Sequence, residues 1–297
     1  GGLSAFYTLD SNDGFGSSLA ALGDWNGDGI PDMAVGAYGD GDGASYAGAV
    51  YIICLNSDGT AKAMHKISIS YGGLSSFYTL DSSDYFGSSL AAIGDLNSDG
   101  IADLAVGAPI TDDGSTWAGA LHILFMTANV TVGGAQKISN SEGGFAAHYT
   151  LAENYRFGSS VASIGDLDGD GISELVVGAY GDNAVYVLFM TTSGTAAAVQ
   201  KISNSDGGLA AHYTVSGSFG SSVAPLGDMN GDGVVDFAVG AHWDDDGSSN
   251  AGAFSLAFAA TNGTGGAAAN VSLLVGGFAS FYTLDTDDYF GGSGYFG

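Results

Sequence analysis

One acidic phrase of ten residues, present four times, constrains the fold of this chain more than any other feature of its sequence. The copies read GDWNGDGIPD, GDLNSDGIAD, GDLDGDGISE and GDMNGDGVVD, and they begin at Gly23, Gly94, Gly165 and Gly227. Each copy leads directly into an apolar run that ends in Gly-Ala. Such a repetition is typical of proteins that stack copies of one supersecondary unit.

The repeats cover the whole chain, which we interpret as a single repeat domain, 1–297. Each repeat opens with a Gly-Gly pair, and this places the four full repeats at 1–71, 72–142, 143–206 and 207–275. The partial repeat 276–297 follows, and its first sixteen residues have the same pattern as residues 1–16. The segment that joins one unit to the next is therefore present once more than a closed ring of four needs. The extra copy could lie idle, mark a cut in a longer array, or dock on the next molecule head to tail, as in a fibre.

Four short strands are predicted in each repeat. In the first repeat they are SSLAALGD, DMAVGAY, AGAVYIICL and HKISIS, each rich in β-forming residues and bounded by Gly, Asp or Ser. No segment has a 3.6-residue apolar period over helical length. The second and third strands are apolar nearly throughout, so both of their faces must be covered. The pattern predicts an all-β fold, a β-propeller-like array of four-stranded antiparallel blades.

The charge of the chain excludes several classes of partner. Five Lys and Arg stand against 32 Asp and Glu, a formal net charge of −27. Nucleic acid and anionic membrane surfaces both require clustered basic residues, so neither is expected as a partner. No apolar run approaches the roughly 20 residues that span a bilayer, so membrane insertion is not expected either. The charge favours cations.

The acidic phrase has the composition of a calcium loop. Calcium takes six to eight oxygen ligands at about 2.3–2.6 Å, several of them from carboxylates. Side chains at positions 1, 3, 5 and 9 of each loop, with the carbonyl at position 7, supply such a set, and position 6 is glycine in every copy. The predicted ligands are Asp24, Asn26, Asp28, Ile30 and Asp32; Asp95, Asn97, Asp99, Ile101 and Asp103; Asp166, Asp168, Asp170, Ile172 and Glu174; and Asp228, Asn230, Asp232, Val234 and Asp236.

Two other interpretations of the loops remain open to weigh. Magnesium prefers a smaller, water-rich octahedral shell, and zinc would want His or Cys ligands, which the loops lack. Clusters of Asp, Asn and Gly also form turns without any ion. Because four copies keep an acid or amide at the same positions, we expect Ca²⁺, about four ions, one in each repeat. Glu174 departs from the pattern by its length.

The order of three motifs resembles a known family. Phe15-Gly16 and its three counterparts precede the acidic loop, and Gly36-Ala37 and its counterparts follow, in the pattern of FG-GAP repeats. The resemblance implies the β-propeller of integrin α-subunits and related secreted proteins, with calcium in this loop and ligands engaged on the opposite face by the loops between the second and third strands. Those loops could equally be solvated hairpin tips. Only the second repeat has the full Gly-Ala-Pro, and integrin propellers have seven blades rather than four.

An extracellular location is expected from three sequons of the form N-x-S/T, at Asn129, Asn262 and Asn270. The single Cys54 lies in an apolar run, which indicates a buried, unreactive thiol. Lys66, Lys137 and Lys201 precede Ile-Ser on the expected outer strand, where edge lysines discourage strand pairing.

The sequence does not indicate an enzyme. His148 and His212 occupy positions where other repeats have Phe, so we interpret them as packing positions. The Ser pairs after Phe-Gly recur in every repeat, whereas a nucleophile would not need four copies. We therefore expect an extracellular calcium-binding protein with a structural or adhesive role, the subunit of a head-to-tail glycoprotein filament. The alternative is a ligand-recognition module, binding an extracellular protein or glycan, of a longer cell-surface receptor or secreted enzyme.

Overall fold

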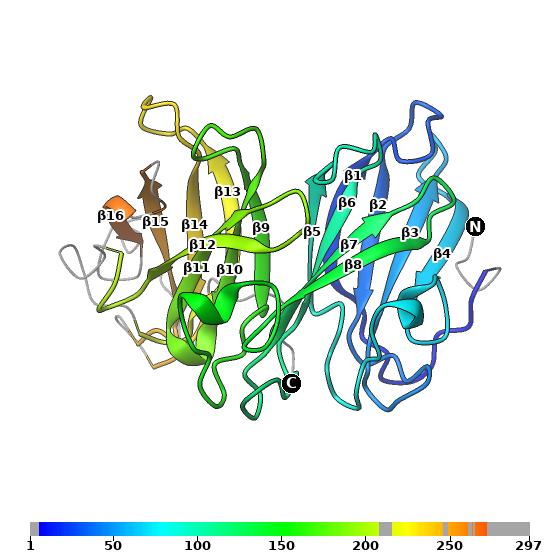
Figure 1. Cartoon of the computed structure of the whole chain (residues 1–297), viewed down its shortest axis with the longest axis horizontal. Coiled ribbons are helices and arrows are strands. Elements are labelled where there is room, and N and C mark those ends of the chain that lie inside the picture. The colour runs from blue at the N-terminus through cyan, green and yellow to red at the C-terminus, as the bar shows by residue number, and fades with distance from the viewer. Residues whose placement is uncertain (1–5, 208–215, 246–248, 261–262, 264, 272–297) are drawn as a thin grey trace.

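The structure is a computed structural model that describes residues 6–207, 216–245, 249–260, 263 and 265–271, with the side chains of the last range left out. Its strands form four antiparallel sheets of four strands each, arranged as the blades of a β-propeller (Figure 1). The predicted all-β propeller fold is therefore confirmed. The helical content of the described residues amounts to three 3-10 turns, η2 (Leu74–Ser76), η3 (Phe145–Ala147) and η4 (Tyr180–Asp182).

Each blade takes its four strands from one repeat, in chain order from the inner to the outer strand. The first blade consists of β1 (Phe15–Gly23), β2 (Asp32–Ala37), β3 (Ala49–Leu55) and β4 (Ala61–Ile67). The second consists of β5 (Ser89–Gly94), β6 (Asp103–Ala108), β7 (Ala120–Met126) and β8 (Val132–Ile138). The third consists of β9 (Ser160–Gly165), β10 (Glu174–Ala179), β11 (Ala184–Met190) and β12 (Ala196–Ile202). The fourth consists of β13 (Phe219–Gly227), β14 (Asp236–Ala241), β15 (Ala253–Ala259) and β16 (Gly265–Val271).

The outer strand differs from the prediction. In the first blade it begins at Ala61 and ends at Ile67, whereas the expected strand ran from His65 to Ser70. The chain turns after Ile67, because the N–H of Ser68 donates to the carbonyl of Tyr71 and the N–H of Tyr71 donates to the carbonyl of Ser68. Ala61, Lys62 and Ala63 lack the β-branched and aromatic residues by which a strand is recognised in a sequence. The turn directs the chain toward the next blade.

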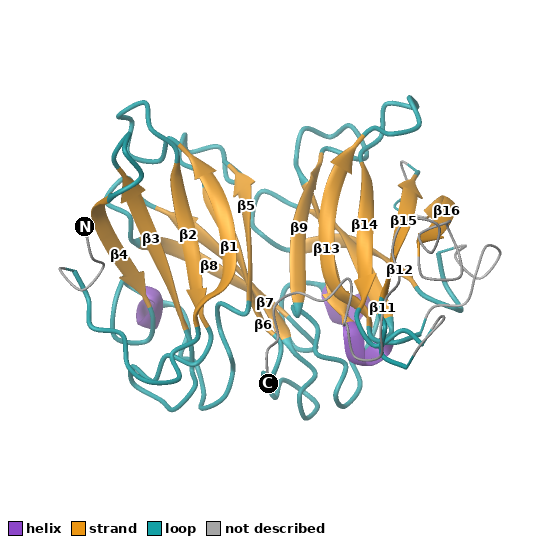
Figure 2. Cartoon of the chain, turned by 180° about the vertical axis from the view of Figure 1, so that it is seen from behind, coloured by secondary structure: helices purple, strands orange, loops and turns teal. Residues whose placement is uncertain are grey.

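Most of the core lies between neighbouring blades, and a smaller cluster around Val35, Tyr51 and Ile53 lies within the first blade. One apolar cluster joins Leu22, Ala34 and Ile52 of the first blade to Leu90 and Val106 of the second. Equivalent clusters join the second blade to the third and the third to the fourth. The inner strands contact one another in the order β1, β5, β9, β13, and Figure 2 shows them in that order. In the described residues, no comparable contact joins β1 to β13.

A repeated backbone contact fixes neighbouring blades against each other. The hydroxyl of Ser89 in the second blade donates a 2.8 Å hydrogen bond to the carbonyl of Gly158 in the third. Gly107 lies against the same carbonyl, so closely that a Cβ on Gly107 would stand 1.9 Å from that oxygen. The same arrangement joins Ser18 and Gly36 to Gly87, and Ser160 and Gly178 to Gly220. The Phe-Gly and Gly-Ala motifs of the sequence thus meet at each junction between blades.

The basic residues of the outer strands are not edge lysines in contact with solvent, contrary to the prediction. Lys66 is 7% exposed, and its ammonium lies 2.7 Å from a carboxylate oxygen of Asp40, also pairs with Asp42, and lies over the ring of Tyr51. Its pKa is raised because the hydrogen bonds to Asp40 and Asp42 outweigh the cost of burial. Two counterparts, Lys137 and Lys201, pair with Asp113 and Asp182. These lysines tie the outer strand to the loop that follows the second strand.

The sequence interpretation of Cys54 is confirmed, whereas that of His148 is wrong. Cys54 is buried, 3% exposed, and burial raises the pKa of its thiol, as expected for an unreactive cysteine. The packing position proposed for His148 is wrong, because that side chain is exposed. Phe6 and Phe77, at the corresponding position of the first two repeats, are also 40% and 41% exposed. His212 lies outside the described residues.

Candidate metal centre

All four acidic loops connect the first and second strands of a blade, and they lie at the same end of the blades. The aspartate at position 1 organises each loop, because its two carboxylate oxygens accept hydrogen bonds from backbone N–H groups. Asp95 accepts from the N–H of Asp99 at 2.9 Å and from that of Gly100 at 2.7 Å. Gly100 has a φ of +88°, a conformation that favours glycine and brings its N–H back toward Asp95. The corresponding aspartates, Asp24, Asp166 and Asp228, accept from the position-6 glycine in the same way.

The acid at position 9 ties the loop to the blade. Asp103 is buried, and its two oxygens accept from the N–H of Leu96, in the loop, and from that of Met126, at the end of β7, each at 3.0 Å. Asp32 and Asp236 make the same pair of contacts. Burial raises the pKa of Asp103 to about 6. These acids were predicted as ligands from their position, but the backbone hydrogen bonds that they accept were not foreseen.

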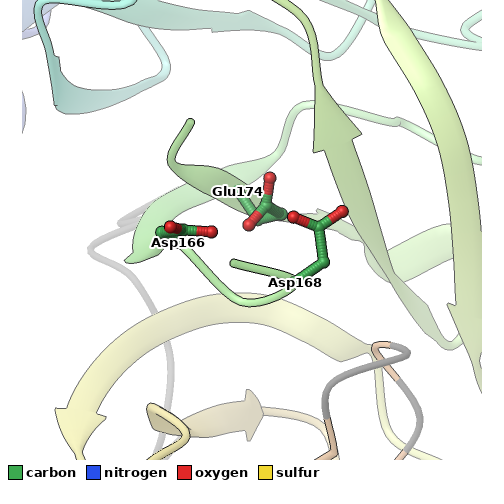
Figure 3. A group of neighbouring side chains, drawn as sticks. All are labelled: Asp166, Asp168 and Glu174. Carbon is green, nitrogen blue, oxygen red and sulfur yellow. The ribbon is translucent and has the colours of Figure 1, made fainter. Parts of the chain in front are cut away.

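The third blade brings carboxylates together most closely. One oxygen each of Asp166, Asp168 and Glu174 lies within 4.8 Å of the others. Figure 3 shows the three side chains next to one another. Within the described residues this is the one group of three or more acidic, His or Cys side chains at that spacing. The longer side chain of Glu174, which departed from the pattern in the sequence, reaches the two aspartates from the start of β10.

Glu174 also has an incomplete set of hydrogen bonds. The residue is fully buried, and Oε2 accepts from the N–H of Leu167 at 2.6 Å. Its Oε1 is buried and has no hydrogen-bond partner at normal geometry. The N–H of Met190 lies nearby and favours the charged form of the Glu174 carboxylate. Burial and the nearby Asp168 raise the pKa of Glu174 to about 7. A buried carboxylate oxygen without a partner, beside two further carboxylates, is an arrangement that a bound cation would complete.

In the first blade a lysine approaches the loop. The Lys62 ammonium lies 2.5 Å from a carboxylate oxygen of Asp28, and this pair raises the pKa of Lys62 and lowers that of Asp28. The other oxygen of Asp28 accepts from the N–H of Ile30. The sequence does not indicate this pair, because Lys62 lies 34 residues from Asp28 and has no counterpart in the second and third blades, where Gly133 and Ala197 take its place.

The four repeats match a family model described as the FG-GAP repeat, over residues 15–53, 86–124, 157–188 and 219–256. The chain belongs to the FG-GAP repeat family. Each matched stretch begins at a Phe-Gly pair and runs through the acidic loop. In the second, third and fourth blades this pair docks on the preceding blade, so the family motif contains both the junction and the candidate metal loop.

Relatives of this FG-GAP chain include integrin α-subunits. It is 34% identical to integrin alpha-PS5 of Drosophila melanogaster over 62% of this chain and 17% of the relative. It is 36% identical to integrin alpha-7 of Homo sapiens over 58% and 13%. The chain thus spans less than a fifth of the length of these relatives. Among solved structures, a protein of unknown function from Bacteroides caccae aligns at 12% identity over 85% of this chain and 59% of that one, with a TM-score of 0.39.

At the other end of the FG-GAP blades lie the loops between the second and third strands. In the first blade, the loop between β2 and β3 and the segment before β1 surround a cavity of about 340 Å³. Its lining includes Asp10, Asp13, Asp40, Asp42 and Lys66. Exposed aromatic rings lie on the loops between the second and third strands. Tyr46, in the first blade, is 37% exposed, and Trp117, in the second, is 42% exposed. The Arg156 guanidinium lies 5.3 Å from the centre of the Trp117 ring.

The third blade lacks most of this loop, and the short turn η4 replaces it. Asn183, which follows η4, restores the contact with the next blade. Its Oδ1 accepts from the N–H of Ser218 at 3.0 Å and from that of Phe219 at 3.2 Å. The shortened loop therefore leaves the junction between the third and fourth blades intact.

The predicted glycosylation sites remain predictions. Asn129 is exposed in the turn between β7 and β8, where an acceptor would be accessible. Asn270 lies on β16 with its side chain outside the description, and Asn262 lies outside the described residues altogether, as does the partial repeat 276–297. Within the described part of the chain, no helix has the length and apolar character needed to cross a membrane.

Proposed function

We propose that this FG-GAP protein is an extracellular, calcium-stabilised propeller with a structural or adhesive role and no catalytic activity. The observation that carries the proposal is the group formed by Asp166, Asp168 and Glu174, with its buried and unpartnered Glu174 Oε1. Calcium prefers several carboxylate oxygens and tolerates irregular geometry, so it fits this set better than magnesium or zinc does.

The residues of each loop have distinct parts in this proposal. The side chains at positions 1, 3 and 5 would hold the ion, and the acid at position 9 would join the ion to the blade through its backbone hydrogen bonds. In the third blade, Glu174 would supply its buried Oε1 directly. A bound ion would link the end of β9 to the start of β10 and would relieve the repulsion between the carboxylates.

A cation that binds only the folded protein stabilises it by mass action. At a hundredfold excess over its dissociation constant, one ion contributes about 2.7 kcal/mol. We propose such a site in each of the four blades. The first blade differs, because Lys62 must leave Asp28 before an ion can use that carboxylate.

The adhesive part of the proposal concerns the opposite face. The exposed Tyr46, Trp117 and Trp243, the last 51% exposed, stand on the loops between the second and third strands. Exposed aromatic side chains are enriched where proteins bind one another. The metal loops at the other end of the strands would then fix the blades without taking part in binding. The second candidate function, recognition of a ligand as a module of a longer receptor or secreted enzyme, uses this same face.

A structural role for the ions predicts two results. Titration calorimetry with Ca²⁺ should detect about four sites in the wild-type protein and a weakened site in Glu174→Gln, and the melting temperature of the wild type should fall in excess chelator. Glu153→Gln, at an exposed acid outside the loops, serves as the control and should bind calcium like the wild type. A melting curve that chelator leaves unchanged would refute the structural role.

The filament version of the function is also a proposal. A polymer would form if each molecule presented two different surfaces that fit each other and the rotation between copies did not close a ring. Sedimentation of the full chain at increasing concentration separates a polymer from a monodisperse module.

A further inference from the structure

Arg156, the only arginine of the chain, has no acidic partner among the described residues, although the chain contains 32 Asp and Glu. The Arg156 side chain is half-buried and donates one hydrogen bond, from Nη1 to the hydroxyl of Tyr180. Its other guanidinium N–H groups meet no acceptor in the described part of the chain. By contrast, each lysine forms an ion pair with an aspartate: Lys62, Lys66, Lys137 and Lys201. A negatively charged ligand would complete the hydrogen bonds of Arg156.

Two aromatic rings hold the Arg156 guanidinium in place. It lies over the ring of Trp117, from the second blade, at 5.3 Å and over that of Tyr180, from the third, at 5.1 Å. Rings stabilise a cation in this position. Because the rings and the Tyr180 hydroxyl already order the guanidinium, a ligand would lose little affinity to the ordering of this side chain.

The same contacts continue into the fourth blade. The Tyr180 ring lies 6.2 Å from that of His242, which lies 4.9 Å from that of Trp243. Trp117, Arg156, Tyr180, His242 and Trp243 therefore form a row of planar side chains, which we call the planar row. Its two end members, Trp117 and Trp243, are 42% and 51% exposed. The planar row offers a ligand flat apolar surface beside a fixed positive charge.

The backbone does not account for the residue types at two positions of the planar row. Trp117 and Arg156 have φ values of +51° and +58°, in the left-handed region that bulky residues rarely adopt. At the corresponding positions the fourth blade has Asn250, with φ +50°, and the first blade has Gly14, with φ +65°. Asn and Gly adopt this conformation more easily. Strained positions of this kind cluster at functional sites, so we interpret the two side chains as parts of a binding site.

We infer that the planar row binds an acidic sugar of a glycan. The Arg156 guanidinium receives the carboxylate of the sugar, since its N–H groups form a fork that matches two carboxylate oxygens. The exposed Trp117 ring receives the apolar face of the sugar ring. The inference rests on the adhesive role proposed above and names the chemical class of its ligand.

The surroundings of the planar row favour a sugar over an acidic protein segment. Asp112 is exposed and accepts from the N–H of Trp117 at 2.7 Å, so its carboxylate lies beside that residue. Asn154 is also exposed, and its N–H donates to the carbonyl of Thr116 at 2.9 Å. The side-chain oxygens of Asp112 and Asn154 accept hydrogen bonds from hydroxyl groups. A sugar carries such hydroxyls next to its carboxylate, whereas Asp and Glu side chains do not.

The net charge of the chain limits the charge of the ligand. At −27, the chain repels a polyanion, and one guanidinium does not offset that repulsion. A glycan with a single carboxylate at its end fits this field better than a polymer of acidic sugars.

Two sugars that differ only in the carboxylate test the inference. Methyl glucuronide carries the acid, and methyl glucoside has a hydroxymethyl group in its place. Saturation-transfer NMR titrations of the full chain in the presence of calcium should show millimolar binding of methyl glucuronide, the range expected for one sugar. Methyl glucoside should bind about tenfold more weakly or not at all, because it lacks the charged acceptor.

Three variants locate the site. Arg156→Gly and Trp117→Asn introduce residue types that the first and fourth blades have at these positions, so both should fold, and circular dichroism checks this. Each should weaken methyl glucuronide binding by about tenfold or more, because each lacks one of the two contacts. Phe77→Asn removes an exposed ring between β4 and β5, outside the planar row, and should bind methyl glucuronide like the wild type.

Other outcomes overturn the inference and separate it from the proposed function. Equal binding of the two sugars, binding of neither, or binding that Arg156→Gly leaves unchanged refutes the acidic-sugar site, while the calcium titration can still succeed. N-acetylglutamate methylamide serves as a probe for an acidic protein side chain. If it binds more tightly than methyl glucuronide and loses affinity in both Arg156→Gly and Trp117→Asn, the ligand is a protein rather than a glycan. Sugar binding without any calcium binding would refute only the calcium role.

Discussion

The hydroxyl of Ser89 donates a hydrogen bond to the carbonyl of Gly158 and thereby joins the second blade to the third at 2.8 Å. The acceptor belongs to the Phe-Gly motif of the third repeat, and the donor belongs to the Ser pair that follows the Phe-Gly of the second. Because the bond ends on a backbone carbonyl, it depends on the approach of two chains rather than on a matched pair of side chains.

That close approach predicts the effect of adding one methyl group. Gly107→Ala places a Cβ 1.9 Å from the Gly158 oxygen, so the two blades must separate. We expect a loss of about 1–3 kcal/mol of unfolding free energy, the usual cost of overpacking a well-packed site. Urea denaturation in the presence of calcium measures this loss of unfolding free energy. Gly41→Ala is the matched control, because Gly41 has open space around it and should change little. Equal stabilities for the two variants would contradict the tight junction.

Asp103 should matter even without calcium. Asp103→Ala removes the acceptor of two backbone N–H groups, those of Leu96 and Met126, and leaves both without their partner. Each unsatisfied buried group costs about 1–3 kcal/mol. Asp99→Asn, at an exposed loop position, should leave the calcium-free protein unchanged and should weaken only its response to calcium. Thermal melts of both variants, with chelator and with calcium, decide between these roles.

The two lysines of the first blade should contribute very differently. Lys66→Ala leaves Asp40 buried without its cation, and breaking such a pair costs about 3–5 kcal/mol. Lys62→Ala removes an exposed pair with Asp28, which solvent screens, so the melting temperature should change little. The same variant should bind calcium at the first blade more tightly than the wild type. Similar melting temperatures for the two variants would contradict the burial of Lys66.

His122 should make the protein sensitive to acid. Burial lowers its pKa from 6.5 to about 3, so the folded protein keeps this imidazole neutral while the unfolded chain takes up a proton below pH 6.5. The stability contributed by the neutral His122 is complete above pH 6.5 and declines as the pH falls toward 3, by roughly 1.4 kcal/mol per pH unit. His122→Phe keeps the ring contacts with Tyr78 and Phe86 and should remove this decline. Urea denaturation of both proteins between pH 7 and pH 4 tests this, and parallel curves would refute it.

The repeat, the blade order and the position of the acidic loops could be predicted from the sequence, because each depends on local patterns that recur. Alternating and continuous apolar runs mark the strands, and Asp-x-Asn-x-Asp-Gly marks the loop. The outer strand could not be placed correctly, since Ala61–Ala63 is held as a strand by its pairing with β3 rather than by its own propensity. Tertiary pairing overrode the local signal there.

Contacts between distant residues were equally hidden. The pair formed by Lys66 and Asp40 depends on the hairpin that brings β4 beside β3, and the Glu174 carboxylate depends on the direction in which β10 begins. Within the loops, the sequence identified the acids, but it did not distinguish the backbone-bonded Asp103 from the partly unpartnered Glu174. Glu174 is one methylene longer than Asp103 on an equivalent backbone, so its oxygens lie at different places. The sequence alone does not show where they lie.

The third blade has lost most of one loop, yet Asn183 still receives the N–H groups of Ser218 and Phe219. A junction that survives such a deletion leaves the connecting loops free to change in length and composition from one blade to the next. A designer could exchange these loops, or graft foreign ones onto them, while the order and spacing of the blades remain as they are.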